Sequence, residues 1–208
     1  MSGLFISFEG IDGVGKSTQI ELLEKYLGEL GRKTIRTFEP GGTELGQEIR
    51  NLLLHRKGQI GARAEALLFA ADRAHHSATK VKPALAAGTD VIIDRYLDSS
   101  VAYQGAGREL DANEVRNLSL FAVQGLLPDL TILLDLDAAA ALSRRDKTGN
   151  EPDRLESEKL EFFEAVRSGY LSLAKAEPNR FFVVDASLSV DEMATQIRNR
   201  VDQLLNRS

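Results

Sequence analysis

Short apolar runs alternate with amphipathic stretches along the chain. Five runs have the length and the β-branched and aromatic content of buried strands, and they lie at 4–8, 33–38, 90–94, 130–135 and 180–185. Between them, apolar residues recur at three- and four-residue spacing, as in amphipathic helices. Strands that alternate with helices predict an α/β fold with a doubly wound parallel sheet and right-handed crossovers.

The stretch 61–80 is predicted to form a helix with two different faces. One apolar stripe, which we expect to pack in the core, consists of Ala64, Leu67, Leu68 and Ala71. The opposite face carries Ala62, Ala66, Phe69 and Arg73. An aromatic ring beside an arginine on an alanine-rich face indicates contact with a ligand or a partner chain. An ordinary two-sided core helix is the alternative.

Composition narrows the class of protein. The 208 residues are 43% hydrophobic and include five prolines, with no linker-like stretch, so we expect one domain over 1–208. Because cysteine is absent, disulfides and thiolate metal sites are excluded. We find no leader-like segment and no apolar run of bilayer length, which predicts a cytoplasmic protein without membrane contact. The net charge of −5 argues against nucleic acid as a partner.

A phosphate-binding loop follows the first apolar run and precedes a predicted helix. It fits the spacing G-x-x-x-x-G-K-[ST] through Gly10, Gly15, Lys16 and Ser17. Glycines let backbone N–H groups approach phosphates at a helix N-terminus, Lys16 adds a charge near the β- and γ-phosphates, and the Ser17 hydroxyl can ligate Mg²⁺. The chain is therefore predicted to bind a nucleoside triphosphate through Gly10, Ile11, Asp12, Gly13, Val14, Gly15, Lys16, Ser17 and Thr18.

Polar residues follow the third and fourth predicted strands, at the sheet edge where α/β proteins bind ligands. Asp94 and Asp135 each close a buried strand and compete for a role beside Mg²⁺. We prefer Asp94, because the neighbouring Arg95 suits an anionic ligand. Arg50, near the middle of a predicted helix, is interpreted from its pattern alone as a solvated charge.

The segment 143–154 contains three arginines, a lysine, a glycine and a proline. Such a segment is commonly a solvated loop. In a protein that transfers phosphoryl groups, it is also typical of a lid that closes over the nucleotide.

Several short motifs occur in a fixed order. They are Phe8-Glu9-Gly10 with Asp12 in the phosphate-binding loop, Glu39-Pro40-Gly41-Gly42-Thr43, the run 67–73, Asp94-Arg95-Tyr96 through Ala102-Tyr103-Gln104-Gly105, and Asp153-Arg154-Leu155-Glu156. With them the whole chain resembles bacterial thymidylate kinases, a family of P-loop nucleoside monophosphate kinases.

The resemblance implies transfer of the γ-phosphoryl group of ATP to dTMP, with Mg²⁺, in a homodimer whose five-stranded parallel sheet has the order 2-3-1-4-5. Kinases for another nucleoside or nucleoside monophosphate share this fold and remain the alternative. A GTP-dependent switch is a more distant one, since the Asn-Lys-x-Asp run that commonly reads guanine does not occur.

The resemblance also implies roles for individual residues. Phe69 stacks on thymine and Arg73 bonds its edge; Arg50 and Arg95 hold the acceptor phosphate; Tyr103 packs under the deoxyribose. The full set implied for dTMP is Asp12, Glu39, Arg50, Phe69, Arg73, Arg95, Ser100, Tyr103 and Gln104. Ser17 and Asp94 would serve Mg²⁺.

Three positions depart from patterns seen in the family. Phe38 stands where many members carry arginine, and Ser100 where some carry asparagine. Gly13 stands where some members carry a loop arginine, so a charge for the transferring phosphoryl group must come from elsewhere. We hypothesise that the lid at 143–154 supplies it. The expected catalytic residues are Asp12, Lys16, Arg95, Arg144 and Arg145.

Overall fold

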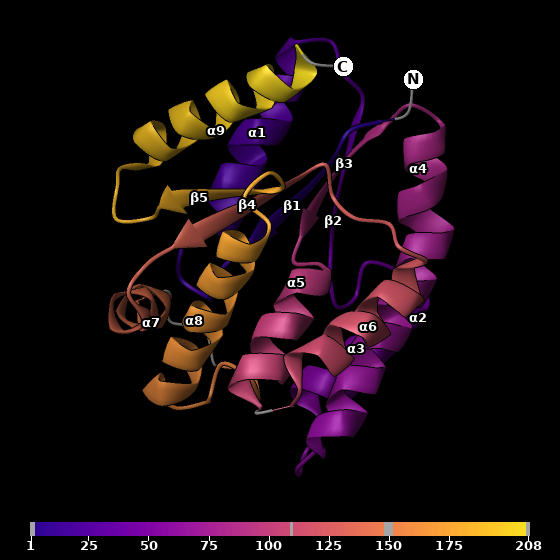
Figure 1. Ribbon diagram of the computed structural model, residues 1–208, viewed down its shortest axis with the longest axis vertical. Coiled ribbons are helices and arrows are strands. Elements are labelled where there is room, and N and C mark those ends of the chain that lie inside the picture. Colours follow the sequence, from indigo (N-terminus) through magenta and orange to yellow (C-terminus); the bar gives the residue numbers. More distant parts are fainter. Residues whose placement is uncertain (1–2, 109, 148–151, 207–208) are drawn as a thin grey trace.

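The computed structural model describes residues 3–108, 110–147 and 152–206 (Figure 1). Its centre is a five-stranded sheet in the order β2-β3-β1-β4-β5, and every neighbouring pair is parallel. The strands are β1 (Phe5–Glu9), β2 (Thr34–Phe38), β3 (Asp90–Asp94), β4 (Leu130–Asp135) and β5 (Phe181–Asp185). The predicted fold and strand order are confirmed, and each strand boundary lies within one residue of its predicted position.

Helices cover both faces of the sheet. The α-helices are α1 (Lys16–Glu29), α2 (Glu44–Arg50), α3 (Ala62–His76), α4 (Lys82–Ala86), α5 (Leu97–Ser100), α6 (Ala112–Val123), α7 (Ala138–Asp146), α8 (Leu160–Ala176) and α9 (Val190–Leu205). Three π-helical segments are η1 (Asn51–His55), η2 (Ser77–Val81) and η3 (Val101–Gly107). Helices α1 and α9 pack on one face, while α4 and α8 lie on the other (Figure 1).

Strand β1 is buried on both faces, which explains why apolar residues stand on both of its sides. Ile6 and Phe8 pack in the cluster that contains the apolar residues of α1 and α9. Phe5 points to the opposite face, where it packs with Val91 and Ile93 of β3. A strand in this position carries apolar residues on both faces, and its two polar residues, Ser7 and Glu9, are buried and hydrogen-bonded. None of the helices in the described residues is long and apolar enough to cross a membrane.

Helix α3 is rotated relative to the prediction for its apolar stripe. Leu67 is 57% exposed, and Ala64 and Ala71 are also exposed, so the expectation that this stripe packs in the core is wrong for the single chain. The opposite face, with Phe69 and Arg73, is buried. Helix α3 packs mainly against α2 and α6 rather than against the sheet, so core packing does not require the stripe.

The predicted lid begins as a helix. Arg144 and Arg145 occupy the last turn of α7, whose N-terminus is capped by Asp137. Residues 148–151 lie outside the described part of the chain. Residues 153–156 then form a turn, in which the Asp153 carboxylate accepts hydrogen bonds from the backbone N–H groups of Leu155 and Glu156. The part at 143–146 is therefore helical, contrary to the expected loop.

Candidate active site

The phosphate-binding loop joins β1 to α1 in a backbone shape that only glycine adopts easily. Gly10 has φ +131° and Gly13 has φ +86°. A Cβ atom at Gly10 would lie 2.5 Å from the carbonyl oxygen of Leu134, and one at Gly13 would lie 2.1 Å from that of Ala141. Helix α1 begins without a side-chain cap, so its first N–H groups are available to an anion.

Lys16 lies folded back over this loop. Its ammonium group donates to the carbonyl oxygens of Gly10 and Ile11 at 3.0 and 3.1 Å, and it lies 3.8 Å from Oδ1 of Asp12. Burial, together with the positive charge of Arg95, lowers the pKa of Lys16. The lysine is held in place by backbone acceptors before any phosphate enters.

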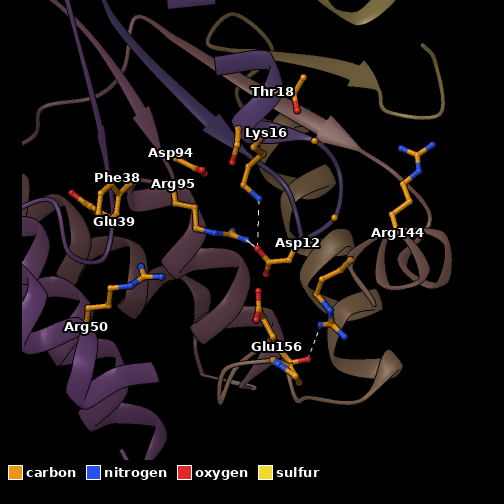
Figure 2. Close-up of a pocket in the computed structure, with 15 residues that line it drawn as sticks. Asp12, Lys16, Thr18, Phe38, Glu39, Arg50, Asp94, Arg95, Arg144 and Glu156 are labelled. Carbon is orange, nitrogen blue, oxygen red and sulfur yellow. Dashed lines mark hydrogen bonds and ion pairs between the residues drawn. The ribbon is translucent and has the colours of Figure 1, made fainter. Parts of the chain in front are cut away.

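Asp12 lies between Lys16 and Arg95 (Figure 2). Nη2 of Arg95 donates to Asp12 at 2.7 Å and to the Tyr103 hydroxyl at 3.1 Å. Burial alone would raise the pKa of Asp12, but the charges of Arg95 and Lys16 outweigh it and hold that pKa well below the ordinary value. The carboxylate therefore stays ionised and fixes the direction of both cations.

A cavity of about 470 Å³ opens over the loop. It is lined by Asp12, Gly13, Gly15, Lys16, Ser17, Thr18, Phe38, Glu39, Arg50, Asp94, Arg95, Arg144, Arg145, Pro152 and Glu156. Figure 2 shows Arg50 and Arg144 on opposite sides of this cavity. Its size and its many cationic side chains suit a polyphosphate.

A second cavity, of about 120 Å³, adjoins the first. Every residue that the resemblance implies for dTMP lines it. The lining also includes residues for which the sequence analysis proposed no contact, namely Pro40, Leu54, Ser99, Asp153, Leu155 and Glu156. Asp12, Glu39, Arg50, Arg95 and Glu156 border both cavities.

Arg73 forms the buried wall of the second cavity. It is 1% exposed, and its Nε donates to Oε2 of Glu39 at 2.7 Å. Its other nitrogens donate to the Ser100 hydroxyl at 3.0 Å and to the carbonyl oxygen of Tyr96 at 3.1 Å. The second oxygen of Glu39 lies 2.9 Å from Nδ1 of His76. The guanidinium plane is thus fixed on three sides by neighbouring groups.

Arg50 borders both cavities instead of lying in solvent. Its Nη1 donates to the carbonyl oxygen of Pro40 at 2.8 Å, and its guanidinium carbon lies 5.7 Å from the centre of the Phe38 ring. The interpretation of Arg50 as a solvated charge is therefore wrong. Phe38, the departure from the family pattern, packs beside this arginine.

Asp94 fits the oxygen chemistry of a hard divalent cation. Its Oδ1 is buried and has no hydrogen-bond partner among the described residues, and it shares the first cavity with Ser17. The competing Asp135 is engaged by Arg167, whose nitrogens donate to its two oxygens at 2.7 and 2.9 Å. The structure thus supports the choice of Asp94 over Asp135.

Arg144 and Arg145 both border the first cavity but are anchored differently. Nη1 of Arg144 donates to the carbonyl oxygen of Ala186, at the end of β5, at 2.8 Å. Nη1 of Arg145 donates to the carbonyl oxygen of Glu156 at 2.7 Å, which ties α7 to the 153–156 turn. Both arginines are near the loop without bonding to it in this structure.

Sequence reasoning gave no role to Glu9, the last residue of β1. Tyr96 N–H, the Ser99 hydroxyl and the Tyr170 hydroxyl donate to its carboxylate at 2.6 to 2.9 Å. Burial, reinforced by the negative charge of Asp98, raises the pKa of Glu9 to about 7. The sequence marked Glu9 only by its place directly before the loop, within the Phe8-Glu9-Gly10 motif.

The loop at the end of the central strand and the two adjoining cavities define a P-loop protein of the nucleotide-kinase class. A family model described as thymidylate kinase matches residues 8–197. The chain is 64% identical over 200 residues to a thymidylate kinase of Leifsonia xyli subsp. xyli, covering 96% of this chain and 95% of that one. The chain belongs to the thymidylate kinase family.

Other relatives agree with this membership. A thymidylate kinase of Clavibacter michiganensis subsp. michiganensis is 60% identical over 205 residues, covering 99% of this chain and 97% of that one. The crystal structure of thymidylate kinase from Ehrlichia chaffeensis superposes with a TM-score of 0.80 at 31% identity, covering 97% of this chain and all of that one.

Proposed function

We infer that the chain transfers the γ-phosphoryl group of ATP to dTMP, giving dTDP and ADP. Its membership of the thymidylate kinase family supports this activity. The observation that carries the inference is the pair of adjoining cavities, which share Asp12, Arg50 and Arg95. Two nucleotides bound there would meet end to end at these charged side chains. The relatives favour none of the alternative substrates.

The donor triphosphate is proposed to lie in the larger cavity, over the N-terminus of α1. The uncapped N–H groups of that helix and the ammonium group of Lys16 would bind its phosphate oxygens. Because Lys16 already bonds two loop carbonyls, little side-chain ordering is needed when ATP binds. Arg144 and Arg145 border the same cavity and would cover the nucleotide.

The acceptor dTMP is proposed to lie in the smaller cavity, with its phosphate toward Arg50 and Arg95. A phosphate monoester has a second pKa of about 6, so at neutral pH it is largely a dianion and needs no general base. One of its oxygens attacks the γ-phosphorus while the bond to the β-phosphate oxygen breaks, and ADP leaves. The protein contributes alignment and neutralisation of charge.

The base is proposed to stack on Phe69, with Arg73, Ser100 and Gln104 at its edge and Tyr103 beneath the sugar. All five residues line the smaller cavity. Base stacking on an aromatic side chain is worth about 1–3 kcal/mol by alanine substitution in other systems. The ion pair of Arg73 with Glu39 fixes the direction of the guanidinium before the base arrives.

Mg²⁺ would be held by the unpartnered carboxylate oxygen of Asp94 and the hydroxyl of Ser17. When bound, this ion neutralises phosphate charge and orients the phosphates. Asp94 is the last residue of β3, so the sheet itself positions the carboxylate.

We further propose that the enzyme is a homodimer that acts in the cytoplasm, where the ATP pool is available. The exposed stripe of α3 continues onto α6, with Leu67 57% and Phe121 82% exposed. Between these helices lies a hollow whose lining is mostly apolar, and it consists of Arg63, Ala66, Leu67, Leu110, Glu114, Val115 and Leu118. Exposed apolar surface of this kind is typical of an interface.

The dimer is tested by sedimentation velocity on Leu67→Glu and Phe121→Glu. Both variants should sediment as monomers, and Leu171→Glu on α8, another exposed leucine, should sediment as the unsubstituted chain does. An unsubstituted chain that is monomeric at micromolar concentration would contradict the proposal.

The activity is tested by measuring ADP formation with dTMP, dUMP, dCMP, dGMP, dAMP and thymidine as acceptors. We expect dTMP to give the highest kcat/KM and thymidine to give no product. A preference for another monophosphate or for the nucleoside would replace the inference with one of the alternatives.

A further inference from the structure

Glu65 is a fully buried carboxylate for which neither the sequence nor the proposed function supplies a role. It lies on α3, and three groups from distant segments bond to it. Its Oε1 accepts from Nε2 of Gln104 at 2.9 Å and from Nε of Arg108 at 3.3 Å. Its Oε2 accepts from Nη2 of Arg154, on the 153–156 turn, at 2.5 Å.

This arrangement fixes which way round the Gln104 amide lies. A carboxylate that faces two guanidinium groups offers only acceptors, so the amide group next to it must present its NH₂. Amide oxygen and nitrogen are often interchangeable on geometry alone, but here the chemistry of the neighbour decides. Gln104 is 1% exposed and lines the smaller cavity, so the amide oxygen, on the other branch, is left for a ligand.

We propose that Glu65 is a positioning residue that sets base specificity through Gln104. With the NH₂ bound to Glu65, the cavity presents a hydrogen-bond acceptor to the edge of the base. Thymine carries a ring N–H donor at N3, whereas cytosine carries an unprotonated acceptor there. The orientation of one buried amide therefore favours thymine over cytosine. This inference rests on the proposed placement of dTMP in the smaller cavity.

Arg154 determines how the side-chain amide of a glutamine at position 65 would be oriented. Its Nε donates to the carbonyl oxygen of Leu53 at 2.7 Å, and its backbone N–H donates to that of Leu54 at 3.2 Å. Arg154 is thus anchored and keeps a donor pointed at the Oε2 position. Whatever group occupies that position must accept a hydrogen bond.

The variant Glu65→Gln should therefore reverse the Gln104 amide. Its one oxygen must take the place facing Arg154, because the bond there is 2.5 Å, whereas the bond from Arg108 to the other position is 3.3 Å and Arg108 keeps Glu158 as a partner. Its NH₂ therefore faces Gln104. Gln104 must then turn its oxygen toward residue 65 and its NH₂ toward the cavity. That change removes the acceptor for thymine N3–H and supplies a donor for cytosine N3.

The experiment compares kcat/KM for dTMP and dCMP in Glu65→Gln and in the unsubstituted enzyme. We expect the ratio of dTMP to dCMP to fall by about tenfold or more, mainly through KM for the monophosphate. The KM for ATP should stay within about threefold. A ratio unchanged in a folded variant overturns the proposal, since a merely structural role would affect both substrates alike.

Glu158→Gln is the matched control. Glu158 accepts from Nη1 of Arg108 at 2.6 Å, on the outer side of the same cluster, whereas the Gln104 amide donates to Glu65. The same carboxylate-to-amide change there should leave the dTMP to dCMP ratio as it is. A fall equal to that of Glu65→Gln would mean that the ratio reports loss of charge alone, which contradicts the proposal.

Gln104→Leu separates this inference from the proposed function. If dTMP is not a substrate of the unsubstituted enzyme, the proposed function fails. If dTMP is a substrate but Gln104→Leu leaves the dTMP to dCMP ratio unchanged, both the base placement and the role of Glu65 are wrong. If Gln104→Leu lowers the ratio and Glu65→Gln does not, the role of Glu65 alone is refuted.

A measurement on the unsubstituted enzyme keeps the proposal testable if Glu65→Gln does not fold. In heteronuclear NMR, the Gln104 side-chain amide is the signal lost in Gln104→Leu. A coupling across the hydrogen bond from this nitrogen to the Glu65 carboxyl carbon should be present in the free and the dTMP-bound enzyme. Its absence in the bound enzyme would show that the amide turns, and would overturn the proposal.

Discussion

Arg95 and Asp12 form an ion pair of 2.7 Å between segments 83 residues apart in the sequence. The pair joins the residue after β3 to the phosphate-binding loop. Arg95 has φ +64°, a left-handed conformation that costs a non-glycine residue of order 1–3 kcal/mol and persists only where its surroundings impose it. Asp12 and the hydroxyls of Tyr103 and Tyr170 impose it here.

Replacing Arg95 by lysine should therefore damage the acceptor site although it keeps the charge. The planar guanidinium group of Arg95 contacts Asp12, Tyr103 and Tyr170 at the same time. The ammonium group of a lysine is too compact to contact all three. We expect kcat/KM for dTMP to fall about 100-fold in steady-state kinetics. Arg36→Lys, at an exposed ion pair with Glu21, serves as the control and should leave activity unchanged.

Lys16→Ala should abolish phosphoryl transfer and leave dTMP affinity within about threefold. The reason is that Lys16 lines the larger cavity only. Activity is measured by ADP formation and dTMP binding by calorimetry. Lys25→Ala, at an exposed position on the same helix, controls for helix stability. A folded Lys16→Ala variant that keeps a tenth of the activity would remove this lysine from the mechanism.

The double variant Arg144→Ala/Arg145→Ala should lower kcat far more than it raises KM for dTMP, because the two arginines border only the ATP cavity. An arginine that meets the transferring group accelerates GTPases by roughly 10³–10⁵, and we expect a smaller factor here because neighbours can partly substitute. Each single variant is measured beside the double one. If the double variant retains kcat within about threefold, the catalytic cation lies elsewhere.

Phe69→Ala should weaken dTMP binding by roughly 5- to 150-fold, which corresponds to a stacking free energy of about 1–3 kcal/mol. Phe69 lines the smaller cavity and does not border the larger one, so the affinity for a non-hydrolysable ATP analogue should be unchanged. Calorimetry with each nucleotide measures both. Equal losses for the two nucleotides would indicate that the ring serves the fold rather than the base.

The raised pKa of Glu9 predicts how the free energy of unfolding depends on pH. Its pKa is raised to about 7 in the folded protein, so between about pH 4.5 and pH 7 the folded state holds a proton that the unfolded chain has released. The free energy of unfolding should therefore fall as pH rises through this window, by at most ~3 kcal/mol from this group. The fall should be smaller in Glu9→Gln. Denaturant unfolding at pH 5 and pH 8 measures this fall in the unsubstituted protein and in Glu9→Gln. An equal fall in both proteins would contradict the raised pKa of Glu9.

The central sheet could be predicted because each of its strands leaves a local pattern. The stretches 91–93 and 132–134 in β3 and β4 are unbroken apolar runs, since the strands are covered on both faces. The phosphate-binding loop is equally local, because the positive φ angles of Gly10, Gly13 and Gly15 all belong to one short stretch of the chain. Local constraints of this kind are visible in a sequence.

The parts that could not be predicted depend on what lies across space. The stripe of Leu67 has a helical pattern, but whether it meets the core or another surface depends on where α3 packs. In the sequence, Arg50 looks like any charged residue of a helix. Only the structure shows that the cis Glu39–Pro40 turn and Phe38 lie beside it. Glu65 has partners 39 to 89 residues away, so nothing near it in sequence marks its role.

The continuity of the two cavities has a consequence for inhibitor design. They meet at Asp12, Glu39, Arg50, Arg95 and Glu156, so a single molecule with an adenosine head, a phosphate tether and a thymidine head could occupy both. Tethering makes the second head bind at a high effective concentration. Phosphate-binding loops occur in many proteins, so the selectivity of such a compound would come from its thymidine half. The tether length would have to match the separation of the two nucleoside sites.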